Sequence, residues 1–385
     1  MKKLFRSTLL AAALSLSLGA ATTAQAESDD VTVGVSLSLT GPASGLGIPV
    51  NTGFKLWPEK VGGESIKFIV LDDASDPAQA QKNAERLISD YKVDVIIGSS
   101  TTTPAIAMGE TAAEGETVQL AASPAIFPEG KGTWTFRLPQ STEVMAGGVI
   151  DHMKKNDVKS FAFIGYSDAY GESWLQELKK LADEAGIEIT TVERYARADT
   201  SVTAQALKAI ASNPDAILIV ASGSGSAMPH TTVVERGFKG PIYQTHSAAS
   251  QDLIRLGGKA VEGSFVVSGL AVLPEGLPDD HPSKEIATKF VNDYEAEYGA
   301  GTRNQFAAHA YDAYLILDKV IPVAREKGKP GTAEFRKALK EALESYGSIP
   351  ITQGVITYTP DDHWGFDSQA QMMLTIKDGK YVAAD

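Results

Sequence analysis

The sequence predicts an α/β protein with two lobes, each built on a sheet of mainly parallel strands and joined by crossings of the chain. Two observations support this fold class. Short apolar runs rich in β-branched residues alternate with longer amphipathic stretches, which is the pattern of repeated βα units. The chain has 385 residues, of which 359 follow a 26-residue leader. This exceeds the size at which one hydrophobic core usually keeps growing, so two lobes are favoured over a single-domain enzyme.

The first 26 residues have the features of a cleaved secretory signal peptide. Lys2, Lys3 and Arg6 precede an apolar run. That run, Leu9–Ala21, ends before the small residues of a cleavage site, Ala24-Gln25-Ala26. It is too short to span a bilayer, and no later stretch approaches the roughly 20 apolar residues that are needed. Because the chain has no cysteine, no thiol can carry a lipid anchor. We expect a secreted periplasmic protein that is not lipid-anchored.

The charge balance excludes one class of partner. Without the three cations of the leader, 32 basic and 48 acidic residues remain, a net charge of −16. Such a surface repels phosphate backbones, so we expect no nucleic-acid partner. The charges are spread along the chain and indicate a solvated surface.

In the first half of the chain, apolar runs predict strands at Val31–Leu37, Ile66–Leu71, Val93–Gly98 and Val118–Ala121. A helix is predicted over Pro77–Tyr91. Asp76 stands at its N-cap, Pro77 in its first turn and Gln79 at the capping-box position.

The same pattern continues after about residue 140. Strands are predicted at Phe161–Gly165, Ile187–Val192, Ala216–Ala221 and Pro241–Thr245. Helices are predicted at Glu143–Lys155, Glu172–Ala185 and Ser201–Ser212. Gly186 is placed to end the second of these helices.

Three extended segments are candidates for crossings between the lobes: Phe136–Pro139, Ser268–Pro274 and Gln353–Tyr358. Three long C-terminal helices are then expected to return to the first lobe: Ser283–Tyr298, Gln305–Lys327 and Thr332–Tyr346. The first lobe would comprise residues 27–139 and about 275–352. The second would comprise residues 140–274 and about 353–385.

Hydroxyl-rich loops follow two strands of the first lobe, where ligands of open α/β sheets bind. One is Ser99-Ser100-Thr101-Thr102-Thr103-Pro104, which leads into a helix that starts about Pro104; the other is Ala121-Ala122-Ser123-Pro124. Hydroxyls beside the unpaired amides of a helix N-terminus form a good carboxylate site. The alternative is that these residues only cap a helix and fill a turn.

Loops of the second half offer further ligand contacts. Tyr170, in Asp168-Ala169-Tyr170-Gly171, is placed to project a ring into a cleft. The segment Ser222-Gly223-Ser224-Gly225-Ser226 provides room and backbone hydrogen bonds, and it is neither a P-loop nor a dinucleotide fingerprint. His246 ends another strand, where its imidazole would bind a ligand or have a purely structural role.

Catalytic and metal-binding patterns are absent from the sequence. There is no G-x-S-x-G elbow, no H-E-x-x-H motif and no cysteine, and the six histidines lack metal-ligand spacing. The acidic stretch Asp72–Asp76 suggests calcium at first, but its end is better explained as a helix cap and no bidentate Glu follows. We therefore expect no cofactor, no metal and no enzymatic activity.

Four motifs, in order, resemble the type I periplasmic binding proteins of the branched-chain amino acid class. They are Ser38-Leu39-Thr40-Gly41-Pro42, Asp72-Asp73-Ala74-Ser75-Asp76-Pro77, Ile97-Gly98-Ser99-Ser100 and Asp168-Ala169-Tyr170-Gly171-Glu172. The resemblance covers the mature chain. It implies two Rossmann-like lobes joined by three strands, closure on a ligand about the hinge, and delivery to the permease subunits of an ABC transporter in the inner membrane. Such receptors usually act as monomers, and we expect a monomer.

The resemblance also implies a binding site. The carboxylate grip of the family corresponds to Ser100 or Thr101 together with Ala122 and Ser123. A shift of one position in this alignment would bring in Ser99. Tyr170 corresponds to the aromatic residue that closes on the ligand from the other lobe.

Three positions depart from the amino-acid binders of the family. His246 stands where those proteins have an acidic residue that holds the ammonium, and Ser224 and Leu46 each stand where they have a Tyr. A buried ammonium without a counter-charge costs several kcal/mol. We therefore favour a small organic acid, most of all an aromatic carboxylate, over a branched-chain amino acid. Two other classes stay open: a sensor module that binds the same ligand, and a secreted hydrolase.

Overall fold

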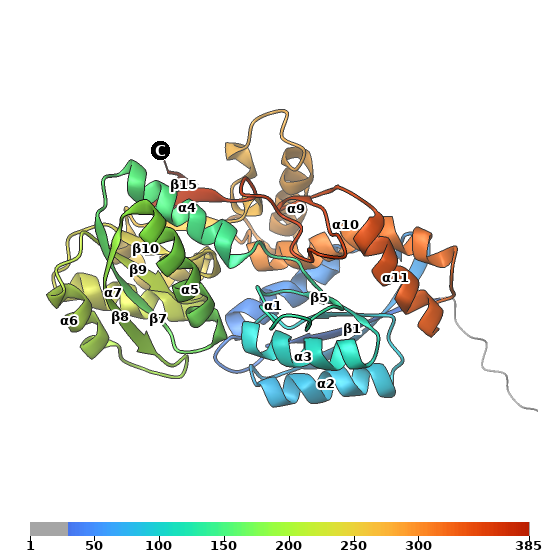
Figure 1. The fold of residues 1–385 in the computed structure, drawn as a ribbon. Coiled ribbons are helices and arrows are strands. Elements are labelled where there is room, and N and C mark those ends of the chain that lie inside the picture. The colour runs from blue at the N-terminus through green and yellow to red at the C-terminus, as the bar shows by residue number, and fades with distance from the viewer. Residues whose placement is uncertain (1–29, 385) are drawn as a thin grey trace, which may run out of the picture.

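The computed structural model describes residues 30–384. Two α/β lobes lie side by side, each around its own sheet (Figure 1). The predicted fold class is thereby confirmed. The predicted signal peptide, residues 1–26, lies outside the described residues. Between residues 30 and 384, no helix has both the length and the apolar character that a membrane span requires.

The first lobe contains a six-stranded sheet in the order β2-β3-β1-β4-β5-β6. All of its pairings are parallel except that of β2 with β3. β1 lies in the middle, with Val33 opposite Val95 of β4. The strands are β1 (Val31–Leu37), β2 (Lys60–Val61), β3 (Glu64–Asp72), β4 (Val95–Gly98), β5 (Val118–Ala121) and β6 (Thr135–Arg137).

Helices from both ends of the chain cover this sheet. Buried side chains of β1, β4 and β5 share one core with the C-terminal helices, and Phe136 and Phe335 are fully buried in it. The helices of this lobe are α1 (Ser44–Gly53), α2 (Pro77–Ser89), α3 (Thr102–Glu114), α9 (Lys284–Tyr298), α10 (Gln305–Arg325) and α11 (Ala333–Ser345).

The second lobe contains a seven-stranded sheet in the order β15-β14-β11-β10-β9-β7-β8. The strands are β7 (Ser160–Tyr166), β8 (Glu188–Tyr195), β9 (Ala216–Val220), β10 (Ile242–Gln244), β11 (Phe265–Ser268), β14 (Met372–Lys377) and β15 (Lys380–Ala383). The helices are α4 (Thr142–Lys155), α5 (Ala169–Ala185), α6 (Thr203–Ala211), α7 (Ala227–Glu235) and α8 (Gln251–Gly257). The pairings of β14 are antiparallel.

Local signals in the sequence act as expected at two helix ends. The Asp76 side chain accepts a hydrogen bond of 2.7 Å from the backbone N–H of Gln79, so the predicted cap of α2 is confirmed. Gly186 ends α5 with φ at 69°, a left-handed conformation that favours glycine.

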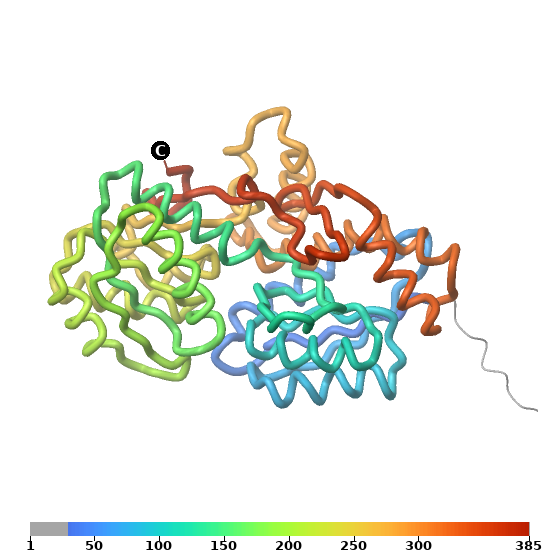
Figure 2. Tube along the Cα trace, in the orientation of Figure 1, coloured from blue at the N-terminus to red at the C-terminus, as the bar shows by residue number. Residues whose placement is uncertain are grey.

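Three segments of the chain meet between the lobes (Figure 2). The Gln140 amide donates to the carbonyls of Gln353 and Ala370, at 3.1 and 2.7 Å. The Gln353 side-chain oxygen accepts from the Ala271 N–H at 3.4 Å. Gln140 directly follows the first predicted crossing, and Ala271 and Gln353 belong to the other two, so residues at or next to all three meet in one buried cluster. That these segments form the hinge stays a prediction.

One part of the predicted lobe boundary differs from the structure. The sequence predicts that the second lobe resumes at about residue 353, but Ile356, Tyr358 and Phe366 pack against the core of the first lobe. The short hairpin β12 (Ile349–Ile351) and β13 (Gly354–Ile356) begins this segment. The reason is complementary packing, because the ring of Tyr358 lies edge-on against Phe136, 5.0 Å between centroids. The chain enters the second sheet only at β14.

Candidate functional site

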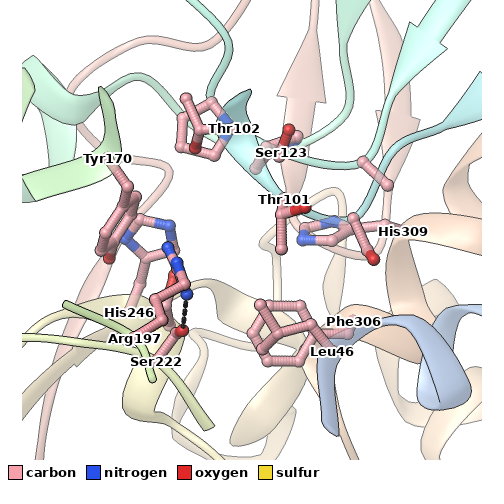
Figure 3. A pocket seen from close by; sticks show the side chains of 15 residues that line it. Leu46, Thr101, Thr102, Ser123, Tyr170, Arg197, Ser222, His246, Phe306 and His309 are labelled. Atoms are coloured by element: carbon pink, nitrogen blue, oxygen red, sulfur yellow. Dashed lines mark hydrogen bonds between the residues drawn. The ribbon is translucent and has the colours of Figure 1, made fainter. Parts of the chain in front are cut away.

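A cavity lies between the lobes, beyond the carboxyl ends of strands from both sheets (Figure 3). Seven of the nine residues predicted from the sequence line it: Leu46, Ser100, Thr101, Ala122, Ser123, Tyr170 and His246. Ser99 and Ser224 do not. The structure thus brings most of the candidates together, while their contact with a ligand stays a prediction.

The first lobe contributes a wall of hydroxyl groups at the N-terminus of α3. Thr101 is the N-cap residue, and its side chain makes no capping hydrogen bond. The amides of Thr102 and Thr103 thus lack a side-chain acceptor at the positive end of the helix. Beside them, the Ser123 hydroxyl is buried and has no hydrogen-bond partner in the part of the chain described. Unsatisfied donors of this kind suit a carboxylate.

Ser99 is a correction to the predicted site. Its hydroxyl donates to Asp73 at 2.6 Å and is fully buried. Asp73 also accepts from the hydroxyl of Ser38 at 2.8 Å and from the N–H of Ser75 at 2.9 Å. Burial raises the pKa of Asp73, and these hydrogen bonds oppose that shift. Ser99 therefore holds the loop between β4 and α3 through Asp73, on the side away from the cavity. The next residue, Ser100, lines the cavity.

Leu46 lies in α1, which forms although Pro49 is inside that helix. It is buried, and its side chain faces the cavity beside Phe306 of α10. Ile48 is 49% exposed and is absent from the lining. Leu46 and Phe306 thus form the apolar part of the first wall.

Tyr170 contributes to the wall of the second lobe. Asp168 caps α5 by accepting from the N–H groups of Tyr170 and Gly171, at 3.1 and 3.2 Å, which fixes the first turn of the helix. The phenol donates to Thr245 at 2.8 Å, and burial raises the pKa of Tyr170 to about 12. Because its hydroxyl is already engaged, Tyr170 offers its ring to a ligand.

Two buried histidines face the cavity from opposite lobes. His246 follows β10 and stacks on Trp174 with 5.9 Å between centroids, whereas His309 lies on α10. Burial lowers the pKa of each imidazole to about 3. Among the described residues, Nδ1 of neither ring has a hydrogen-bond partner. Both rings are therefore neutral at pH 7 and have a nitrogen available to a ligand.

Ser224 is the second correction. It lies in the 3-10 helix Gly223–Ser226 and is exposed. Because β9 ends at Val220 and the chain turns sharply into this helix, Ser222 reaches the cavity in its place.

Sequence reasoning missed one charged residue of the site, Arg197. It follows β8, lines the cavity and keeps 18% of its side chain exposed. Its Nε donates to Asp168 at 2.5 Å and its Nη1 to Ser222 at 2.7 Å. The only signal in the sequence was the position of this cationic residue just after a strand. Phe306 and His309 were also missed; their spacing of three places both on one face of the first turns of α10.

The described residues that line the cavity include no Asp and no Glu. The nearby carboxylate of Asp168 is paired with Arg197. Nothing in this lining would compensate the charge of a ligand ammonium. Among residues 30–384, no group of three or more metal-ligating side chains is arranged to hold a metal ion.

The family model for periplasmic binding proteins matches residues 30–379. The chain belongs to the periplasmic binding protein family. This confirms the family resemblance of the four sequence motifs. A solved structure of an extracellular ligand-binding receptor from Rhodopseudomonas palustris is 45% identical, has a TM-score of 0.91 and covers 93% of this chain and 100% of that one.

Two proteins that are less similar to this chain are also informative. The Leucine-, isoleucine-, valine-, threonine-, and alanine-binding protein of Pseudomonas aeruginosa is 24% identical over 311 residues, 78% of this chain and 80% of the relative. A solute-binding protein of an ABC transporter from R. palustris, solved in complex with benzoate, is 21% identical with a TM-score of 0.77 and covers 92% of this chain and 95% of that one. The second likeness shows the shared fold alone.

Proposed function

We propose that this periplasmic binding protein is the receptor of an ABC importer and that it captures a small aromatic carboxylate between its lobes. The observation that carries the proposal is the chemistry of the cavity. Hydroxyls and free amides gather at the α3 N-terminus, and no acidic side chain is present in the described lining. An anion is stabilised there, whereas an ammonium would be desolvated without a counter-charge.

The remaining walls fit the body of an aromatic acid. Leu46 and Phe306 offer apolar surface from the first lobe, and Tyr170 offers its ring from the second. Such pockets are mostly apolar with a few polar groups that orient the ligand. The benzoate complex described above shows that this fold accommodates an aromatic acid.

Transport follows from closure of the two lobes. A ligand that touches both walls stabilises the closed arrangement, and the permease subunits in the inner membrane recognise that arrangement. In this proposal the protein acts in the periplasm as a monomer, needs no cofactor and performs no chemistry of its own.

A thermal-shift screen tests the ligand class. The mature protein, refolded to remove any carried-over ligand, is mixed with leucine, valine, benzoate, 4-hydroxybenzoate and benzoylformate. Stabilisation by aromatic acids and not by leucine or valine is expected. The Pseudomonas relative favours the other candidate, a branched-chain amino acid. Stabilisation by leucine or valine alone would overturn the aromatic assignment.

A further inference from the structure

We propose that Arg197 is a specificity-determining residue that selects an aromatic monocarboxylate with a neutral oxygen at its far end, such as a phenol, methoxy or keto oxygen. This inference rests on the proposed function, because it concerns the same cavity. It adds what the ligand presents to the second lobe once its carboxylate is held by the first.

Arg197 stands at a boundary between two cavities. It lines the inner cavity described above and also a second, outer cavity, which residues of both lobes line. Asp168 lines the outer cavity only. The guanidinium therefore has its carboxylate partner on the side of the outer cavity and the ligand cavity on its other side. Figure 3 shows Arg197 in the wall of the inner cavity, bonded to Ser222.

Four neighbours hold the guanidinium in place. Asp168 and Ser222 accept its Nε–H and one Nη1–H, and its carbon lies 4.1 Å from the ring centroid of Tyr166 and 6.0 Å from that of Tyr170. Asp168 is itself fixed as the N-cap of α5. A guanidinium has five N–H donors, so three lack a partner among the described residues. Arg197 is thus a rigid donor, suited to one oxygen position.

Charge decides which oxygen is favoured. The positive charge of Arg197 is already matched by Asp168 at 2.5 Å, and no other Lys or Arg lines the inner cavity within the described chain. A second ligand carboxylate would add an unmatched negative charge near Asp168, which is unfavourable in a partly desolvated site. A neutral oxygen accepts the same hydrogen bonds without that repulsion. His246, neutral and unpartnered at Nδ1, supplies a second polar group nearby.

The test compares probes that differ only at the para position. Isothermal titration calorimetry at pH 7 measures Kd for benzoate, 4-methoxybenzoate, 4-hydroxybenzoate and terephthalate. The two neutral-oxygen acids are expected to bind about tenfold tighter than benzoate, the effect of one hydrogen bond to a charged group. Terephthalate is expected to bind no better than benzoate.

Two variants then separate recognition from folding. Arg197→Met should bring the benzoate to 4-methoxybenzoate Kd ratio to within about twofold, since the donor is gone. Asp168→Asn keeps a side chain that can cap α5, and it removes the negative charge that compensates Arg197. It should therefore improve terephthalate relative to benzoate by about tenfold.

The pair Arg194 and Glu172 is the matched control. It joins the same elements, β8 and α5, through an ion pair outside both cavities. Arg194→Met and Glu172→Gln should leave every Kd ratio unchanged. Equal affinity for all benzoates in the wild type, or tighter binding of terephthalate, would overturn the inference and leave the proposed function standing. Failure of every aromatic probe to bind would overturn both.

Discussion

Ser123 has a buried hydroxyl with no hydrogen-bond partner in the described chain. An unsatisfied buried hydroxyl lowers stability unless something binds it. The group also lies beside the amides at the α3 N-terminus, where a carboxylate is expected. The same unsatisfied hydroxyl therefore lowers the stability of the unliganded protein and is free to hydrogen-bond the ligand carboxylate.

Ser123→Ala should weaken the binding of an aromatic acid by about tenfold or more, because a hydrogen bond to a charged group is lost. Calorimetric titration with the best aromatic probe measures this. The melting temperature of the unliganded variant should stay level or rise. Ser224→Ala is the control, since Ser224 is exposed outside the cavity, and its Kd should not change. Equal losses in both variants would contradict the assignment of Ser123.

His246 should make stability depend on pH. Burial lowers its pKa from 6.5 to about 3, so between these values the unfolded chain binds a proton that the folded protein does not. The free energy of unfolding therefore falls as pH is lowered through this window and is flat, with respect to this group, above about pH 7. Moving from pH 8 to pH 5 should cost about 2 kcal/mol through His246.

Urea unfolding of the wild type and of His246→Gln at both pH values measures that difference. The variant should lose about 2 kcal/mol less than the wild type on acidification. His281→Gln, at a half-buried position outside the cavity, should behave like the wild type. An identical pH dependence in His246→Gln would show that the imidazole is not buried as described.

At the scale of elements, the turn from β4 into α3 places the hydroxyl wall. Gly98 ends β4 with φ at 123°, and a Cβ atom there would lie 1.9 Å from the backbone oxygen of Ser36. Only glycine allows β1 and β4 to pair this closely at the point where the chain leaves the sheet. The position of Ser100 and Thr101 depends on this contact.

Gly98→Ala should destabilise the protein by about 2 kcal/mol or more and should abolish ligand binding at micromolar concentrations, since the loop must move. Chemical unfolding and calorimetry measure the two effects. Gly147→Ala is the control: Gly147 lies within α4, and a Cβ there meets nothing within 4 Å. That variant should be slightly more stable, by about 0.5–1 kcal/mol. Normal stability in Gly98→Ala would contradict the close approach.

Most elements could be predicted because their signals are local. Pro77 and Gly186 mark helix ends, and the fully buried strand β9 is a continuous apolar run. Several elements were not expected, among them the strands β14 and β15 and the helix α1. The strand pair β14–β15 has a weak apolar pattern because only one face is buried. Helix α1 contains Pro49 and two interior glycines, which favour a loop locally, so its helical form depends on packing against α10.

At the scale of the whole molecule, contacts between the lobes surround the site. Gln305, at the start of α10, donates its side-chain amide to the carbonyl of His246 in the other lobe. The glutamines at the crossings add further buried hydrogen bonds. Closure of the cleft would bring the first-lobe wall with Thr101 and the second-lobe wall with Tyr170 into contact with the same ligand. We expect ligand binding and lobe closure to be coupled for this reason.

Binding of an aromatic acid should lower the radius of gyration of the protein in small-angle X-ray scattering. At a ligand concentration 100 times Kd, it should also raise the free energy of unfolding by about 2.7 kcal/mol. Ser123→Ala at the same ligand concentration should show a smaller change in both. A rise in stability at constant radius of gyration would contradict the coupling and indicate a cleft that is closed without ligand. Light scattering of the same samples tests the expected monomer.

Apolar periodicity and helix caps are local properties, so the sequence alone predicts the fold class, the order of βα units and the loops that carry the hydroxyl wall. Which side chains of those loops face the cavity depends on contacts between segments that are far apart in the chain. A shift of one or two residues separates Ser99 from Ser100 and Ser224 from Ser222, and hydrogen bonds to distant residues such as Asp73 select between them. Arg197 and His309 come from other segments, which only folding brings to the site.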